Sequence, residues 1–220
     1  KALFRSAQII GRRFQIVHVR QGQEIIEVTT YRGHHDSDEA KPSTSKQSEK
    51  GLLLRDNVYG SLEDDAKRRD LTVNAMYYDP DDESVLDQQS GLKDIEARLI
   101  RIIGDPATRY REDPVRMLRV VRFSARLQFD IESETAEAIA VCGPLLSEIP
   151  AARLFDEFLK LFMSGYAKST FLLLCNYDLL RYLTPEAADR IAKEPRFKQM
   201  VTAAMQSTDQ RVRKDRPAAP

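Results

Sequence analysis

Two arginines, an aspartate and an asparagine lie close together in the middle of the sequence. Arg68, Arg69 and Asp70 are consecutive, and Asn74 follows four positions after the aspartate. On a helix, this spacing places Asp70 and Asn74 on the same face. Guanidinium groups grip phosphate oxygens, and a carboxylate or an amide can hold ribose hydroxyls, so the cluster could bind a nucleoside triphosphate. The alternative is a solvated helix with ion pairs, which spacing alone favours slightly.

A second cluster combines an acceptor with a fork of donors at the predicted start of a helix. In Glu112-Asp113-Pro114-Val115-Arg116, Asp113 is an N-cap candidate and Pro114 suits the first helical position. Asp113 and Arg116 lie three residues apart and could together hydrogen-bond the edge of a nucleobase. Alternatively, Asp113 caps the helix and pairs with Arg116, which requires no ligand. Spacing alone leaves both interpretations open.

The helix that follows this cluster carries a basic stripe beside an apolar one. The apolar stripe predicts a face buried in a core and consists of Val115, Leu118, Val121 and Ala125. The basic stripe consists of Arg116, Arg119, Arg122 and Arg126. These arginines could contact RNA phosphates, although a solvated basic face is commoner in general.

A β-hairpin is predicted near the start of the chain. Residues 14–19 and 24–30 are rich in β-branched and apolar types, and Gly22 lies between them as a turn signal. On the second strand, Glu27 is a carboxylate flanked by apolar neighbours. Residues 33–50 are polar and charged without periodicity, which predicts a loop.

The rest of the chain changes from mixed elements to helices at about Gly104. Ser61 begins a capping box, so a helix carrying the first cluster is expected there, followed by a hairpin of residues 76–78 and 84–86. Further helices are predicted to be capped at Ser133, to follow Pro150, and to span residues 166–182 as one helix or a pair. The tail after Pro185 is polar and reads as weakly helical.

Composition narrows the class of protein. The 220 residues are 42% hydrophobic, and 34 basic residues balance 34 acidic ones, so net charge argues neither for nor against nucleic acid. Cys142 and Cys175 lack metal or disulfide spacing and are expected to be buried thiols. His34 and His35 are expected in a polar loop and not in a metal site. The sequence shows no membrane-length apolar run or signal peptide, which predicts a cytoplasmic protein.

Four motifs, in order, resemble those of the class II tRNA nucleotidyltransferase and bacterial poly(A) polymerase family. Residues 68–74 resemble its R-R-D-x-x-x-N motif, and residues 112–116 resemble E-D-x-x-R. Residues 87–94 resemble its D-x-x-x-G-x-x-D hinge, and residues 26–32 resemble the strand with the third acidic residue. The resemblance covers nearly the whole chain, and four ordered motifs are far more specific than one.

The resemblance implies an α+β fold and a chemistry. Residues 1–104 are expected to form part of a nucleotidyltransferase head sheet with helices, and residues 105–220 an all-α neck and the start of a body that binds RNA and the nucleotide base. The family uses two-metal Mg²⁺ phosphoryl transfer, with ATP and RNA 3′ ends as substrates. Its main ligands, a D-x-D after two glycines, are expected outside this chain, because Asp36-Ser37-Asp38 lies in the polar loop without glycines. We therefore expect an inactive fragment, cut at both ends.

The resemblance also implies roles for single residues. Glu27 is similar to the acidic residue near the metals, which makes it a tentative metal ligand and, with the active-site aspartate Asp70, a catalytic residue. Asn74 would place the ribose, while Asp113 and Arg116 would read the adenine edge. Nucleotide binding is implied for Arg68, Arg69, Asn74, Asp113, Arg116, Arg119 and Arg122. RNA binding is expected of Arg12, Arg13 and Arg126.

Two activities compete within this family. Residues 11–14, 31–35 and 153–157 resemble the poly(A) polymerase branch, which favours template-independent addition of AMP to RNA, a modification that promotes RNA decay. The alternative is a CCA-adding tRNA nucleotidyltransferase. A second alternative is an RNA-binding module without catalysis. A monomer is expected in each case.

Overall fold

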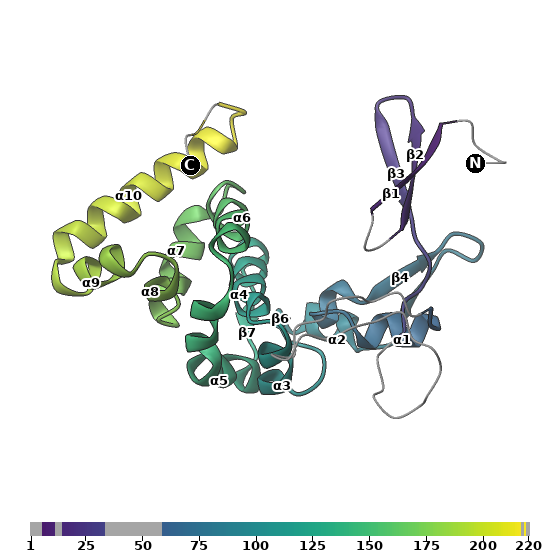
Figure 1. Ribbon diagram of the computed structural model, residues 1–220, viewed down its shortest axis with the longest axis horizontal. Helices are drawn as coiled ribbons and strands as arrows, with labels where there is room; N and C mark the ends of the chain where they lie inside the picture. The colour runs from purple at the N-terminus through teal and green to yellow at the C-terminus, as the bar shows by residue number, and fades with distance from the viewer. Residues whose placement is uncertain (1–5, 12–14, 34–58, 217, 219–220) are drawn as a thin grey trace. The chain divides into compact units, whose positions relative to one another are not determined.

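A computed structural model describes residues 6–11, 15–33, 59–216 and 218. It divides into two compact units, Lys1–Arg69 and Asp70–Pro220 (Figure 1). Strands and helices occur in both units, so the chain is an α+β protein, as predicted. The boundary expected at residue 104 lies inside the second unit, and the division into head and neck stays a prediction.

The first unit contains a small antiparallel sheet in the order β1-β2-β3. Strands β2 (Ile16–Gln21) and β3 (Glu24–Val28) form the predicted hairpin, with Gly22 in the left-handed region at φ +64°. Strand β1 (Ala7–Ile10) pairs with β2 and was not predicted. All of β3 is exposed. The apolar side chains that this sheet buries are Ala7 and Val19, which belong to the other two strands.

Helix α1 (Leu62–Lys67) begins at the predicted capping box. Asp64 N–H donates to the Ser61 hydroxyl at 3.2 Å, and Ser61 N–H donates to the Asp64 carboxylate at 2.8 Å. The helix ends before the first cluster, with Arg68 as its C-cap. The prediction that one helix carries Arg68 to Asn74 was therefore wrong.

Backbone pairing within the second unit explains what replaces that helix. Leu71 is extended and fully buried, and it forms an antiparallel bridge with Ile102. The Asp70 carbonyl accepts from Ile103 N–H at 2.9 Å, and Thr72 N–H donates to the Arg101 carbonyl at 3.1 Å. A short 3₁₀ helix, η1 (Thr72–Asn74), follows. Burial of Leu71 and these hydrogen bonds outweigh local helix propensity.

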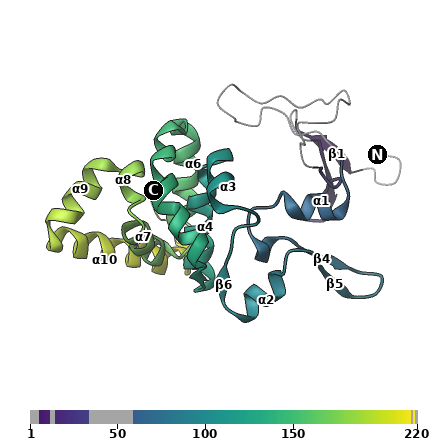
Figure 2. The same ribbon diagram turned by 90° about the horizontal axis from the view of Figure 1, so that it is seen from below.

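The second unit continues with short strands and one helix. Strands β4 (Met76–Asp79) and β5 (Ser84–Asp87) form the second predicted hairpin. After α2 (Gly91–Glu96), strand β6 (Leu99–Ile100) pairs in parallel with β7 (Asp130–Ile131), a pairing that no local pattern announced. Figure 2 shows the hairpin and α2 at the opposite end of this unit from α8 to α10.

Helices form the remainder of this unit, and two of their predicted caps need correction. Asp113 ends one helix as its C-cap, and Pro114 is the N-cap of the next, although the Asp113 carboxylate still accepts from Val115 N–H at 3.3 Å. Glu132, not Ser133, caps α5, since its carboxylate accepts from Thr135 N–H at 2.9 Å. The tail forms an 18-residue helix and is not weakly helical. The helices are α3 (Pro106–Glu112), α4 (Val115–Leu127), α5 (Ser133–Cys142), η2 (Gly143–Glu148), α6 (Ala151–Phe162), α7 (Ala167–Asn176), α8 (Leu180–Leu183), α9 (Pro185–Lys193) and α10 (Pro195–Val212).

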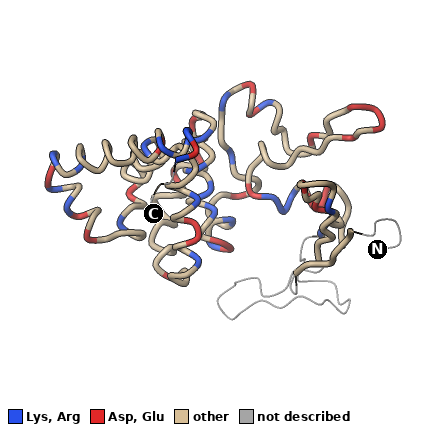
Figure 3. Tube along the Cα trace, turned by 90° about the horizontal axis from the view of Figure 1, so that it is seen from above, with Lys and Arg blue, Asp and Glu red and all other residues tan. Residues whose placement is uncertain are grey.

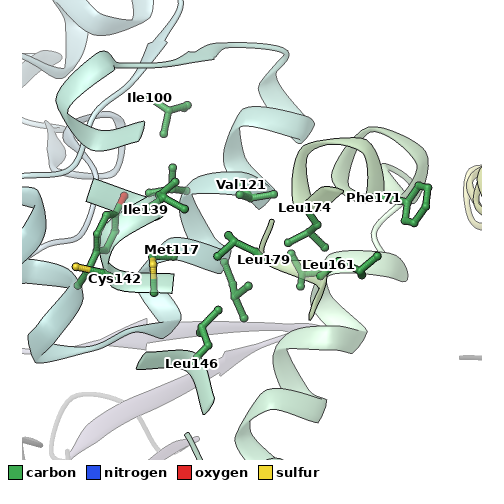
Figure 4. Close-up of a cluster of buried hydrophobic side chains, with 14 of the residues drawn as sticks. Ile100, Met117, Val121, Ile139, Cys142, Leu146, Leu161, Phe171, Leu174 and Leu179 are labelled. Atoms are coloured by element: carbon green, nitrogen blue, oxygen red, sulfur yellow. The ribbon is translucent and has the colours of Figure 1, made fainter. Parts of the chain in front are cut away.

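The core of the second unit surrounds α4, whose predicted apolar stripe is buried. Figure 4 shows Met117 and Val121 of this helix among buried side chains from the helices around it and from the α7–α8 connection: Ile139, Leu146, Leu161, Leu174 and Leu179. Cys142 is buried as predicted, whereas Cys175 is only half-buried, and burial raises the pKa of both thiols. None of the helices in the described part of the chain is long and apolar enough to span a membrane.

A buried carboxylate fixes α10 to the start of α7. Asp209 of α10 accepts from the N–H groups of Ala167 at 2.5 Å and Lys168 at 3.0 Å. Arg213 donates to the carbonyl of Gly165 through Nε at 3.1 Å and Nη2 at 2.9 Å. Asp209 therefore supplies the acceptor that the first turn of α7 otherwise lacks.

Asp209→Ala is expected to lower the free energy of unfolding by about 3 kcal/mol, because two backbone N–H groups lose their acceptor inside the protein. Urea denaturation followed by circular dichroism measures this change. The matched control is Asp189→Ala on α9, an exposed position where we expect a change below about 0.5 kcal/mol. Equal effects of the two substitutions would contradict the docking role of Asp209.

Candidate functional site

Asp70 is a nearly buried carboxylate held by several donors in the second unit. Its side chain is 11% exposed, its Oδ2 forms an ion pair with Arg119 Nε, and its Oδ1 accepts from Leu71 N–H at 2.9 Å. Burial by itself raises the pKa of this carboxyl. The hydrogen bond and charge of Arg119, with bonds from Leu71 and Asn74, outweigh burial and lower the pKa below its ordinary value. Asp70 is therefore ionised at neutral pH.

Asn74 meets Asp70 as predicted, although not across a helix face. From the end of η1, its side chain lies near the Asp70 carboxylate and helps to lower the pKa of that group. Asp94, a buried residue of α2, accepts from the Thr72 hydroxyl at 2.7 Å and from Arg101 Nε at 3.1 Å. These bonds hold the short 3₁₀ helix that carries Asn74.

The predicted hinge motif accounts for this arrangement. Asp87 accepts from Gly91 N–H at 2.8 Å and Leu92 N–H at 2.9 Å, and thereby caps α2. A Cβ atom on Gly91 would lie 2.4 Å from the Thr72 carbonyl oxygen, so only glycine permits this approach. In this structure the motif positions the segment of Asp70 and Asn74. Its aspartates were recognised from the sequence as a hinge, not as supports of the candidate site.

Arg116 is fixed by the end of the preceding helix. Its side chain is 13% exposed, and its Nη1 donates to Glu112 Oε2 at 2.6 Å and to the Arg109 carbonyl at 2.8 Å. Arg109 Nη1 donates to the same Glu112 oxygen at 2.8 Å. Burial, followed by the positive charge of Arg116, lowers the pKa of Arg109. Arg116 thus pairs with the residue four positions earlier, and the alternative of an i,i+3 pair with Asp113 was wrong.

Asp113 engages a distant arginine in place of Arg116. Its Oδ2 accepts from Arg153 Nη2 at 2.7 Å, across 40 residues of sequence. Arg153 lies in the first turn of α6. Sequence reasoning missed Glu112 and Arg153 as parts of this cluster, although both belong to segments that it had singled out. The motifs that contain Glu112 and Arg153 were visible in the sequence, but which residue each of them pairs with is visible only in the tertiary structure.

The basic stripe of α4 divides into paired and exposed members. Arg119 and Arg122 place their guanidinium carbons 5.8 and 5.4 Å from the ring centre of Phe123. Arg122 also lies 3.6 Å from Glu157, and burial lowers its pKa. Arg126 is exposed. Figure 3 shows the basic and acidic residues of these helices interleaved, with acidic residues gathered at the turn of the β4–β5 hairpin.

The first unit holds the remaining candidate residues. Arg68 and Arg69 both donate to Asp65, a buried residue of α1 that the sequence did not single out. Glu27 on β3 is 63% exposed and contacts His18 Nε2 at 3.1 Å. The arginines at positions 12 and 13 lie outside the described residues, as do the two histidines at positions 34 and 35. Within the described ranges, no three acidic, histidine or cysteine side chains gather as a metal site.

Comparisons with known proteins agree with the motifs. A family model described as the poly(A) polymerase head domain matches residues 1–101, and one described as a probable RNA- and SrmB-binding site of polymerase A matches residues 128–191. Poly(A) polymerase I of Escherichia coli O6:H1 is 46% identical over 217 residues, covering 98% of this chain and 47% of that protein. The chain belongs to the bacterial poly(A) polymerase I family. It spans about half the length of these relatives.

Further relatives refine the position within the family. Poly(A) polymerase I of Haemophilus influenzae is 49% identical over 94% of this chain and 46% of its own length. A solved CCA-adding enzyme of Bacillus stearothermophilus, in complex with CTP, matches with a TM-score of 0.67 at 32% identity, covering 83% of this chain and 41% of that chain. The nucleotidyltransferase fold is thus shared with both branches, while identity is higher to the poly(A) polymerases.

Proposed function

We propose that the protein carrying this chain adds adenylates from ATP to RNA 3′ ends without a template. The observation that carries the proposal is the match of 98% of the chain to a poly(A) polymerase I at 46% identity. The ordered clusters around Asp70 and Arg116 support it, because they supply fixed polar groups of the kind that position a nucleotide. Polyadenylation that promotes RNA decay is the role we infer for the product.

Base selection is assigned to Asp113 and Arg116. Both described contacts of Arg116 use Nη1, so its Nε and Nη2 donors are the ones proposed to face a base. Adenine presents an amino donor next to a ring-nitrogen acceptor, which an aspartate and an arginine complement. Cytosine presents the same order of groups, whereas guanine and uracil reverse it. This chemistry explains why CCA addition is the second candidate within one family.

The remaining roles follow the resemblance. Asp70 and Asn74 are proposed to hold the ribose side of the nucleotide, and Arg68 and Arg69 its triphosphate. Arg119 is proposed as a support, because its guanidinium already pairs with Asp70. Arg122 takes the same supporting role, since it lies between Phe123 and Glu157.

RNA and Mg²⁺ are the other partners proposed for the protein. Arg126 is exposed and is proposed to meet RNA phosphates, while Arg12 and Arg13 keep their predicted RNA-binding role. Mg²⁺ supplies charge stabilisation during phosphoryl transfer. Glu27 is the ligand proposed from this chain. A cytoplasmic monomer remains our expectation.

The test uses the whole protein with Mg²⁺, a short RNA, and ATP, CTP or both. Long tails with ATP alone are expected from a poly(A) polymerase. Short additions that require both nucleotides would assign the CCA-adding activity instead. Binding of RNA without extension would favour the non-catalytic module.

A further inference from the structure

Asp65 is a buried carboxylate that binds two consecutive arginines. Its side chain is 3% exposed. Its Oδ1 accepts from Arg68 Nε at 2.9 Å and Nη2 at 2.6 Å, and its Oδ2 accepts from Arg69 Nε at 3.1 Å and Nη2 at 2.8 Å. Each carboxylate oxygen thus accepts hydrogen bonds from the Nε and Nη2 groups of one arginine. A buried carboxylate is tolerated when its charge and lone pairs are matched in this way.

The two arginines remain accessible while they are held. The exposed fraction is 22% for the Arg68 side chain and 41% for Arg69. A long arginine side chain normally samples many rotamers, and an anion must restrict them when it binds. Attachment to Asp65 restricts both guanidinium groups beforehand, which lowers the entropic cost of binding an anion.

Asp65 also joins this pair of arginines to a backbone junction, the place where the chain around Arg32 pairs with the chain around Tyr59. It accepts from Arg32 N–H at 3.2 Å, and Arg32 forms an antiparallel bridge with Tyr59. Gly60 N–H donates to the carbonyl of the residue before Arg32 at 3.1 Å. A Cβ atom on Gly60 would lie 2.5 Å from the Gly33 Cα atom, so the two backbones are in close contact. One carboxylate therefore fixes both the arginine pair and the junction.

We propose that Asp65 is a positioning residue that orients Arg68 and Arg69 as a preformed pair for the triphosphate of the incoming nucleotide. The inference deepens the proposed function and rests on it, because that function assigns the two arginines to the triphosphate. RNA also carries phosphates, but a fork of two adjacent guanidinium groups suits the clustered oxygens of a triphosphate better than single phosphodiesters.

The test is Asp65→Asn in the whole protein. Asparagine keeps the size of the side chain but offers one neutral acceptor oxygen, so it can hold only one arginine and holds it weakly. The dissociation constant and the KM for ATP are expected to rise about tenfold, while kcat changes less than about threefold, since preorganised phosphate contacts act on the bound ground state as well as the transition state. The dissociation constant for a short RNA should not change.

The matched control is Glu63→Gln, which removes one negative charge from the same helix. Glu63 is exposed and pairs with Lys67 at 2.8 Å. We expect ATP binding to stay within about twofold of the unchanged protein, because exposed i,i+4 pairs contribute little. A double-mutant cycle with Arg69→Ala adds a second readout: Asp65→Asn should weaken ATP binding much less in that background.

Several outcomes would overturn the inference. They are an unchanged affinity for ATP, an equal loss of affinity for ATP and RNA, a loss for RNA alone, or additive effects in the cycle. If Asp65→Asn does not fold, Asp65→Glu keeps the charge but moves the carboxylate by one methylene, and it must weaken ATP binding as well. Failure of the unchanged protein to make A tails counts against the proposed function only, because ATP binding is measured without turnover.

Discussion

Asp70→Asn in the whole protein is expected to slow adenylate addition by about a hundredfold or more. The carboxylate organises Arg119, Asn74 and the Leu71 amide around one buried point. Asparagine fills the same space without the charge, so the three partners lose a common anchor, and displacement of a positioned group by about 1 Å can cost this much in rate. Single-turnover kinetics with ATP and a short RNA measure the effect.

A control separates catalysis from stability at this position. Asp81→Asn, at the exposed turn of the β4–β5 hairpin, makes the same change in charge and should leave the rate unaltered. The double variant Asp70→Asn with Arg119→Met removes the arginine charge that Asp70→Asn leaves without its partner, and it should recover part of the lost stability. If the rate recovers as well, Asp70 acts only as the partner of Arg119 and its proposed role in holding the nucleotide is wrong.

The pH dependence of stability gives an independent check on Asp70. Its pKa is lowered in the folded state, so its contribution to stability is complete above the unfolded-state pKa of about 4 and is lost as the pH falls through the lower folded-state value. The difference in unfolding free energy between the unchanged protein and Asp70→Asn should therefore be constant from neutral pH down to about pH 5. It should shrink below about pH 4. A constant difference down to pH 3 would contradict the lowered pKa.

For Asp70 and Asn74, the sequence predicted that the two residues come together better than it predicted how they are held. Asp70 and Asn74 do meet, but the element that joins them is a 3₁₀ helix anchored by Asp94. Helical spacing suggested a continuous helix, and it failed because Leu71 gains more by burial and pairing with Ile102 than by extending α1. Local pattern carries no information about a strand segment 31 positions away.

The same limit applies to charge pairs. Two acids, Asp113 three positions earlier and Glu112 four positions earlier, are both reasonable partners for Arg116 by sequence. In the structure Arg116 pairs with Glu112. Asp113 pairs with Arg153, which is far away in the sequence. By contrast, the capping box at Ser61 was predicted correctly, because all the atoms involved lie within four residues.

Arg116→Ala is expected to reduce kcat/KM for ATP by about a hundredfold and to weaken the preference for ATP over GTP and UTP, since a well-placed fork of donors contributes about 1–3 kcal/mol of base discrimination. Arg116→Lys keeps the charge but not the planar fork, so it should recover part of the affinity for nucleotides of any base without restoring the preference for ATP. Competition between the four nucleotides in a single extension reaction measures the preference, and initial rates with ATP alone measure kcat/KM.

Arg111→Ala is the matched control for this prediction. Arg111 lies on α3, immediately before the cluster, and is exposed. Its loss makes the same change in charge without removing either partner of Arg116, Glu112 or the Arg109 carbonyl. We expect its nucleotide preference to match that of the unchanged protein. If Arg116→Ala and Arg111→Ala lower activity equally and leave the preference for ATP intact, Arg116 contributes charge alone. Base selection must then reside in other residues.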